Sequence, residues 1–309
     1  MILLYGSSGF IGKKLIFYLK KNNIKFKEVK LFKEKKLIYN HDYLLKLIET
    51  NITKHKPNVI INLHAQTDID SSYNDPCYDI FHNSILNIQI LCAIKKKNNK
   101  IKFINTGTAT QIGHTDLIKQ VSFNLPNKPL TIFDLNKQYT EDFMSLYSKK
   151  FNLKTINVRL TNVIGFGSTH SNSRGAVNKM ISNGIKNKTI NIFGSGKYKR
   201  DYILVDDVCR GLIKIAKKNK IFEEDFIYMC SGKGTSLLKL SKYIQNSIHK
   251  LYNLEIKINL LKKDMAKIDK RSFIGNTQKL EKYLKWKPMK FNERMIFDIV
   301  NDFKRSNLI

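Results

Sequence analysis

The chain has 309 residues, a hydrophobic fraction of 42% and a formal net charge of +30. These values fit a soluble α/β protein, and no apolar run approaches the length of a membrane span. The charge alone suggests a nucleic-acid partner, but the basic residues are scattered and mostly lysine, so we attribute it to composition bias. The four cysteines form no C-x-x-C pair, which favours a reducing cytosol and argues against a metal site. No leader precedes the strand-like run at residue 2. Together with the scattered charge and the short apolar runs, these features predict a cytoplasmic protein without a membrane partner or a nucleic-acid partner.

Strand-like and helix-like segments alternate over the first 160 residues. The strand-like runs are 2–6, 28–32, 59–64, 101–106 and 155–160, and the helix-like segments include 11–21, 42–55, 78–96 and 133–150. Alternating β and α units predict an α/β fold with a doubly wound parallel sheet. From about residue 165 a Gly- and Ser-rich stretch, a helix at 176–187 and short elements predict a smaller lobe. We expect this lobe to be partly interleaved with the core, because the segment of about residues 200–230 returns to the core.

The segment YGSSGFIGKK joins the first predicted strand to the first predicted helix. Its glycines, Gly6, Gly9 and Gly12, permit a tight turn, a close approach of the backbone to a pyrophosphate, and close packing of the helix on the sheet. The helix N-terminus adds unpaired N–H groups that attract an anion. The pattern therefore predicts a Rossmann core that holds a dinucleotide. The residues expected to contact it are Gly6, Ser8, Gly9, Phe10, Ile11 and Gly12.

The end of the second strand should contact the adenosine ribose. An acidic residue there favours NAD, whereas basic residues favour the 2′-phosphate of NADP. The segment LFKEKK places Glu34 among Lys33, Lys35 and Lys36, which favours NADP, although lysine is abundant throughout the chain. The predicted cofactor is therefore NADP or NAD.

Further motifs follow in order along the chain. They are NLHAQTDID, INTGTATQIG, DLNKQYTED, VRLTNVIGFG and IFGSGKYKRDYILVDDV. With the glycine loop they make nearly the whole chain resemble the extended short-chain dehydrogenase/reductase family, which contains sugar-nucleotide epimerases, dehydratases and 4-keto-sugar reductases. The resemblance implies an NAD(P)-binding core at 1–165, a sugar-nucleotide-binding lobe at 166–309 and a homodimer formed through helices near 85–97 and 135–150. It also implies an oxidoreductase or epimerase for a 4-keto-6-deoxy sugar nucleotide, in the deoxysugar synthesis of a surface polysaccharide.

The resemblance also implies roles for individual residues. His64, Ala65 and Thr106 would join the glycine loop at the cofactor, and Lys137 would bind the nicotinamide ribose and lower the pKa of a neighbouring acid. Thr108 would hydrogen-bond the reacting sugar hydroxyl or carbonyl. Asn162, Arg200 and Arg271 would bind the diphosphate of the substrate. The alternatives are structural: turn caps for the threonines, ion pairs for the arginines and a solvated lysine.

The stretch TIFDLNK departs from the pattern Tyr-x-x-x-Lys of the family. The tyrosine is the general acid or base there. Lys137 is present, but the tyrosine position is Phe133, whose ring can neither give nor take a proton. The interval from Thr108 and the position of Glu141 support this register.

Three hypotheses therefore stay open. In the first, the chain is an active enzyme in which Asp134, Thr108, a substrate hydroxyl or a water moves the proton. In the second, it binds cofactor and sugar nucleotide as a partner or sensor. The third, more remote, is a basic nucleic-acid-binding protein. Among active enzymes a dehydratase is disfavoured, because Ala109 and Thr110 stand where that reaction needs an acidic residue.

Overall fold

The main layer of the protein is a six-stranded sheet, seen in a computed structural model that describes residues 1–31, 40–113, 115, 119–167, 175–218, 225–262 and 270–306. Its strand order is β2-β1-β3-β4-β5-β9, and every neighbouring pair is parallel. The strands are β1 (Ile2–Tyr5), β2 (Phe26–Val29), β3 (Val59–Asn62), β4 (Lys102–Thr108), β5 (Lys154–Leu160) and β9 (Phe226–Met229). The predicted doubly wound parallel sheet of the Rossmann type is confirmed.

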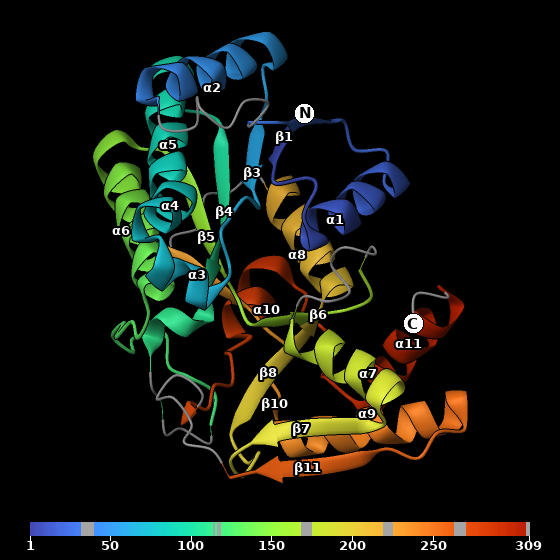
Figure 1. Cartoon of the computed structure of the whole chain (residues 1–309). Helices are drawn as coiled ribbons and strands as arrows, with labels where there is room; N and C mark the ends of the chain where they lie inside the picture. The colour runs from blue at the N-terminus through green and yellow to red at the C-terminus, as the bar shows by residue number, and fades with distance from the viewer. Residues whose placement is uncertain are drawn as a thin grey trace.

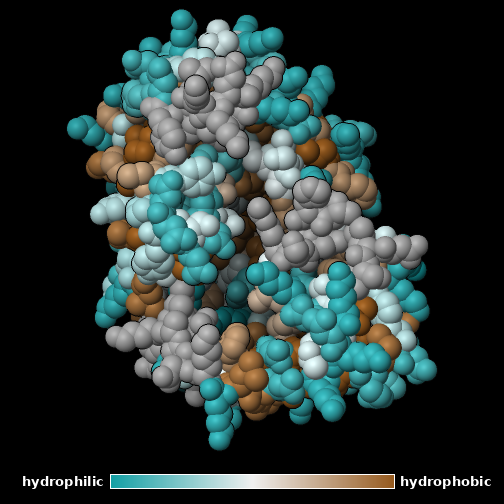
Figure 2. Space-filling model, viewed as in Figure 1, coloured by the Kyte–Doolittle hydropathy of each residue, from teal (hydrophilic) through white to brown (hydrophobic). Residues whose placement is uncertain are grey.

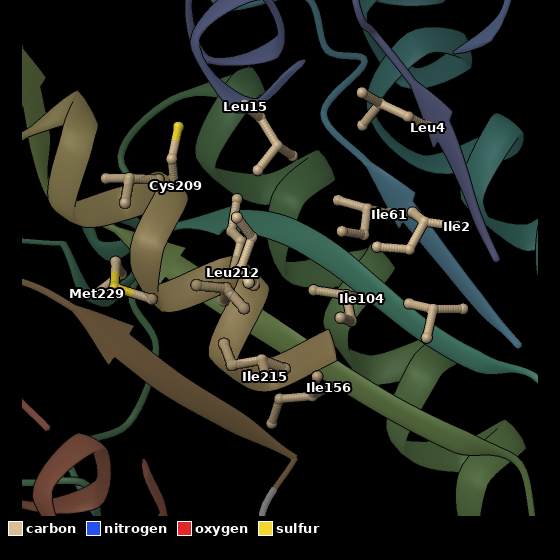
Figure 3. Packing of buried hydrophobic residues seen from close by; sticks show 14 of the residues in the cluster. Ile2, Leu4, Leu15, Ile61, Ile104, Ile156, Cys209, Leu212, Ile215 and Met229 are labelled. Carbon is tan, nitrogen blue, oxygen red and sulfur yellow. The ribbon is translucent and has the colours of Figure 1, made fainter. Parts of the chain in front are cut away.

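Helices cover both faces of this sheet (Figure 1). On one face α1 (Phe10–Lys21) packs against α8 (Val205–Lys217), and on the other lie α2 (His41–His55), α5 (Leu86–Lys97) and α6 (Ile132–Phe151). The central strands β1, β3 and β4 are buried along their whole length, as expected for a parallel sheet, and β1 and β3 read as almost continuous apolar runs. In Figure 3, Leu212 of α8 lies over the strands near Ile104 and Ile156, within one buried hydrophobic cluster.

Two shorter helices lead into α5. They are α3 (Ile69–Asn74) and α4 (Pro76–Ile80), and a π-helical turn at Phe81–Ile85 joins α4 to α5. A 3-10 turn at Ala109–Ile112 follows β4 directly, so the threonines at the end of β4 and in this turn lie close together.

The elements after residue 160 divide between the main sheet and a second layer. The second layer contains β6 (Asn162–Ile164), β8 (Lys199–Leu204) and β10 (Gly234–Ser236) in one small sheet, and β7 (Thr189–Phe193) with β11 (Lys257–Leu261) in another. Helices α7 (Ala176–Asn187), α9 (Leu237–Tyr252) and α11 (Glu293–Arg305) pack around these strands. The chain returns to the main sheet with α8 and β9, and α10 (Gln278–Leu284) packs beside β9.

The second strand differs from its predicted range of 28–32. It runs over Phe26–Val29, because its register with β1 pairs Ile2 with Phe26 and Tyr5 with Val29. The four-residue strand β1 thus fixes the bounds of β2 at the edge of the sheet, and this pairing is not visible in local sequence. Among the helices that the structure describes, none is both long enough and apolar enough to cross a membrane.

Candidate active site

A cavity of about 610 Å³ lies at the carboxyl ends of the central strands, between the main sheet and the second layer. Figure 2 shows this face of the molecule hollowed near its centre, with hydrophobic residues visible inside the hollow. The volume is typical of a cofactor or ligand site, and the carboxyl ends of parallel strands are where open α/β sheets bind ligands. Predicted site residues on its wall are Gly6, Ser8, Gly9, Phe10, Ile11, Gly12, Ala65, Thr106, Thr108, Phe133, Lys137 and Asn162.

The glycine loop forms one end of the cavity. Gly6 has φ +74°, and a Cβ added there would lie 2.4 Å from the backbone nitrogen of His64. A Cβ at Gly12 would lie 2.3 Å from the carbonyl oxygen of Gly6, so α1 packs against the loop as closely as backbone allows. A Cβ at Gly9 would meet only the Gly6 oxygen at 3.4 Å. The loop therefore leaves an open cradle at Gly9, the N-cap of α1, where the backbone N–H groups of a helix N-terminus face the cavity.

His64 and Ala65 follow β3 and lie beside this loop. Ala65 lines the cavity, whereas the His64 ring turns inward, with Nε2 2.6 Å from Nδ1 of His82. Burial, together with His82 and Lys137, lowers the pKa of His64 to about 3, so its imidazole is neutral at physiological pH. No motif pointed to His82, which comes from the π-helical turn before α5.

Lys137 of α6 lines the cavity together with Phe133. Its Nζ donates to the carbonyl oxygen of Thr106 at 3.1 Å and lies 5.8 Å from the centre of the Phe133 ring. Burial lowers the pKa of Lys137 to about 8, and the negative charge of buried Asp79 acts in the opposite direction. Thr106, Phe133 and Lys137 therefore meet on one wall, as the predicted register of α6 requires.

Thr108 ends β4 and opens a chain of hydrogen bonds that leads away from the cavity. Its Oγ1 lies 2.7 Å from Oγ1 of Thr110, and Thr110 donates to a carboxylate oxygen of Asp134. The other carboxylate oxygen accepts from Arg271 Nη1 at 3.3 Å. Asp134 is fully buried and Arg271 is 9% exposed. Arg271, expected at the substrate diphosphate, thus pairs with Asp134, and it is not among the described residues on the cavity wall.

The two other residues expected at the diphosphate lie on neighbouring strands of the second layer. Asn162 of β6 is exposed to the cavity and donates through Nδ2 to the backbone oxygen of Asp201 at 3.0 Å. Arg200 of β8 is partly buried opposite Thr235 of β10. Within the described wall of the cavity, Asn162 is present and Arg200 is not.

A buried ion pair fixes α6 against the sheet. Arg159 of β5 donates to both carboxylate oxygens of Glu141, with Nε 2.9 Å from Oε2, and its guanidinium lies 3.5 Å from the centre of the Phe226 ring. Asn157 also donates to Oε2 at 2.6 Å. Glu141 is one turn beyond Lys137, so this network sets the position of the lysine along the wall. The sequence register included Glu141 but gave no partner for it.

Asp201 is fully buried and joins three segments of the chain. Its carboxylate accepts from the backbone nitrogen of Ser231 at 2.8 Å, the Ser231 hydroxyl at 2.9 Å, Gly232 N at 2.9 Å and Gly275 N at 3.1 Å. Burial raises the pKa of Asp201 to about 6, although these hydrogen bonds act to lower it. Asp201 is therefore a structural tie between β8, the end of β9 and the segment before α10.

The chain matches a family model described as the NAD dependent epimerase/dehydratase family over residues 2–228. The chain belongs to this family. It is 28% identical to a putative UDP-glucose 4-epimerase of Methanocaldococcus jannaschii, over 80% of this chain and 82% of that protein. It is 30% identical to a GDP-6-deoxy-D-talose 4-dehydrogenase of Aggregatibacter actinomycetemcomitans, over 84% and 83%.

The same fold is found in a solved UDP-glucose 4-epimerase of Thermotoga maritima. That structure, with UDP-glucose, superposes with a TM-score of 0.84 at 23% identity and covers 99% of both chains. Membership of the NAD-dependent epimerase/dehydratase family makes this protein an NAD(P)-dependent enzyme, and the open cradle at Gly9 fits a dinucleotide. Lys33, Glu34, Lys35 and Lys36, on which the prediction of NADP rather than NAD depends, lie outside the described residues. In the described ranges no cluster of His, Cys, Asp and Glu could hold a metal ion.

Proposed function

We propose that the protein is an NAD(P)-dependent reductase or epimerase of a nucleotide-activated sugar. The observation that carries the proposal is the single cavity that joins the glycine loop, the Thr108–Lys137 wall and Asn162 of the second layer. A dinucleotide over Gly9 and a nucleotide sugar on β6 would then meet at Thr108. The relative that acts on a GDP-6-deoxy sugar supports a 6-deoxy, 4-keto substrate class, and the resemblance supports a place in surface-polysaccharide synthesis.

Each wall of the cavity has a separate task in this proposal. The nicotinamide ring, when bound, exchanges a hydride with a sugar carbon. Lys137 would bind the ribose and present its ammonium to the reacting centre, while Thr108 would hydrogen-bond the sugar oxygen. Asn162 would contact the diphosphate. Phe133 would stand at the position where the extended short-chain dehydrogenase/reductase family has its proton-transferring tyrosine.

The substrate can be identified by mass spectrometry of the small molecules that remain on the purified protein. A panel of UDP-, GDP-, CDP- and dTDP-linked 4-keto sugars with NADPH or NADH, followed by nicotinamide absorbance, then measures reduction; epimers are separated chromatographically. We expect the wild-type protein to turn over one class of these nucleotide-linked sugars. The variant Lys137→Met should lose that turnover. Tight binding of cofactor and sugar nucleotide without any turnover would show a binding protein instead. RNA retained on a filter at about 0.15 M salt would point to the nucleic-acid hypothesis.

We also propose a homodimer that buries one side of α6. Leu135, Tyr139, Phe143 and Leu146 are exposed by 38%, 46%, 37% and 56%, and their spacing places them along one stripe of the helix. Size-exclusion chromatography with light scattering should give twice the chain mass of 36.0 kDa. Leu146→Glu should yield monomers, whereas the control Phe17→Glu, which changes a 54%-exposed residue of α1, should not.

A further inference from the structure

We propose that Thr108, Thr110 and Asp134 form a proton relay that replaces the missing tyrosine hydroxyl. This inference rests on the proposed function, because it concerns the proton that accompanies hydride transfer. Phe133 lines the cavity where a hydroxyl is needed and has none to offer. A chain of hydroxyl protons starts at Thr108 on the cavity wall and ends on a buried carboxylate, one residue after Phe133.

The direction of each hydrogen bond is fixed by the carboxylate. Thr110 has a single hydroxyl proton, and it donates that proton to Asp134 Oδ1, because an ionised carboxylate only accepts. In the 2.7 Å contact between the two threonine hydroxyls, Thr108 must therefore be the donor. The protons are thus aligned from the cavity toward Asp134, which is the order that a relay away from the substrate requires.

Thr108 is also the point at which the relay meets the cavity. Its hydroxyl oxygen can accept two hydrogen bonds, and one comes from the backbone nitrogen of Thr110 at 3.3 Å. Within the described part of the chain the other acceptor position has no protein donor, and Thr108 lies on the cavity wall. A substrate hydroxyl can therefore donate to Thr108 while Thr108 donates to Thr110.

Asp134 is placed to hold a charge and to receive a proton. It is fully buried in the first turn of α6, where the helix dipole favours an anion, and Arg271 Nη1 contacts its second oxygen at 3.3 Å. Asp134 is absent from the described cavity wall, so its route to a ligand runs through the two threonines. Arg271 stays on Oδ2 when Oδ1 takes the proton.

The step balances as follows for oxidation of a sugar alcohol. The carbinol carbon would give its hydride to the oxidised nicotinamide that the cavity would hold, and the carbinol proton would pass to Thr108. The Thr108 proton passes to Thr110, and the Thr110 proton passes to Asp134. The products are a ketone, the reduced dinucleotide and a neutral Asp134 carboxyl group; reduction runs the same sequence backwards. Both threonines end as neutral hydroxyls, with the direction of the hydrogen bond between them reversed.

The first pair of variants breaks the relay at its middle. Thr110→Val keeps the shape of the side chain and leaves the Asp134–Arg271 pair in place, whereas Thr110→Ser keeps the hydroxyl. We expect Thr110→Val to lower kcat about 100-fold or more, the usual contribution of a general base, and Thr110→Ser, which keeps the hydroxyl, to recover most of that loss. Calorimetric dissociation constants for NAD(P) and sugar nucleotide should be unchanged in both. Thr110→Val should lower the melting temperature, because Asp134 Oδ1 loses its donor, so kcat is compared well below the melting temperature of every variant.

The second pair tests the carboxylate on the same helix. Asp134→Asn should lower kcat by a similar factor, and the control Asp142→Asn, which changes an exposed acid of α6, should not. Adding Phe133→Tyr to Asp134→Asn should restore most of the activity, because the phenol then supplies the proton directly at the cavity wall. A purely structural Asp134 would show the same loss with either residue at 133.

Each outcome decides the matter. A proton inventory that is curved in wild type shows that several protons move in the rate-limiting step, as the relay requires. In the Phe133→Tyr, Asp134→Asn double variant the inventory should be linear, because the phenol transfers a single proton. If Thr110→Val turns over at the wild-type rate, the relay is refuted while the proposed function stands. If wild type is inactive and Phe133→Tyr alone is active, the relay is also refuted. If neither shows turnover of any sugar nucleotide, the proposed function fails and the relay fails with it.

Discussion

The glycine loop gives a prediction in which two alanine substitutions, three residues apart, have opposite effects. Gly9 has φ −73° and ψ 174°, a conformation that alanine adopts freely, and its added Cβ would make only one contact, 3.4 Å from the Gly6 oxygen. At Gly12 the added Cβ would lie 2.3 Å from the same oxygen, about 1.1 Å inside that ordinary contact, and 2.7 Å from Ser7 Cα. Backbone must therefore move at Gly12 and need not move at Gly9.

The two variants should separate folding from cofactor binding. Gly12→Ala should lose about 1–3 kcal/mol of unfolding free energy, because an added carbon overpacks a closed contact. Gly9→Ala should keep that free energy or gain about 0.4–1 kcal/mol by restricting the unfolded chain. It should nevertheless weaken NAD(P) binding at least tenfold, about 1.4 kcal/mol, because the methyl group occupies the cradle needed by the pyrophosphate.

Denaturant unfolding and isothermal titration with NAD(P) measure the two quantities on the same samples. Wild type is the reference for Gly9→Ala. Gly175→Ala is not a suitable control, because Gly175 has φ +83° and any side chain there is strained. Wild-type cofactor affinity in Gly9→Ala would refute the placement of the pyrophosphate over this loop. Unchanged stability in Gly12→Ala would refute the argument from close packing.

Three further outcomes follow from buried charges. Glu141→Gln should destabilise the fold by about 3–5 kcal/mol in denaturant unfolding, because it leaves Arg159 buried without its counter-charge. Lys137 has a pKa of about 8 in the fold against 10.5 unfolded, so the folded state loses the proton first and stability should rise by up to about 3 kcal/mol between these pH values. Unfolding of Lys137→Met should lack that rise. Asp201→Ala should cost at least about 3 kcal/mol in thermal unfolding, because the donors of Ser231, Gly232 and Gly275 lose their acceptor.

The parts of the fold that sequence predicted well are those set by local signals. At the N-terminus, the apolar run and the spacing of the glycines are enough to predict a strand, a tight turn and a helix. At the start of α6, Thr131 is a local helix cap that accepts from the backbone nitrogen of Asp134. Periodicity likewise predicted the helix α6, whereas the expected site positions of Lys137 and Phe133 came from the resemblance to the Tyr-x-x-x-Lys pattern; both residues line the cavity.

The contacts that sequence could not predict join distant segments. Arg271 and Asp134 are separated by 137 positions, and Arg159 meets Glu141 only because β5 and α6 pack side by side. The resemblance implies that Arg271 binds the substrate diphosphate, because an arginine stands at the matching position. A motif gives only the residue type, so it could not predict the internal ion pair of Arg271 with Asp134. His82 had no motif at all, because its partner is fixed by the fold.

The loss of a hydroxyl at residue 133 leaves the support of α6 intact. Ser84 donates to the backbone oxygen of Asn136 at 2.7 Å, Thr140 donates to the backbone oxygen of Asn83, and Glu141 holds Arg159. None of these contacts involves the side chain at 133, so the helix presents Lys137 to the cavity whether that side chain is phenylalanine or tyrosine. The chemical difference is therefore confined to one oxygen atom, and restoring it by Phe133→Tyr changes the proton path without changing the scaffold that positions the reaction.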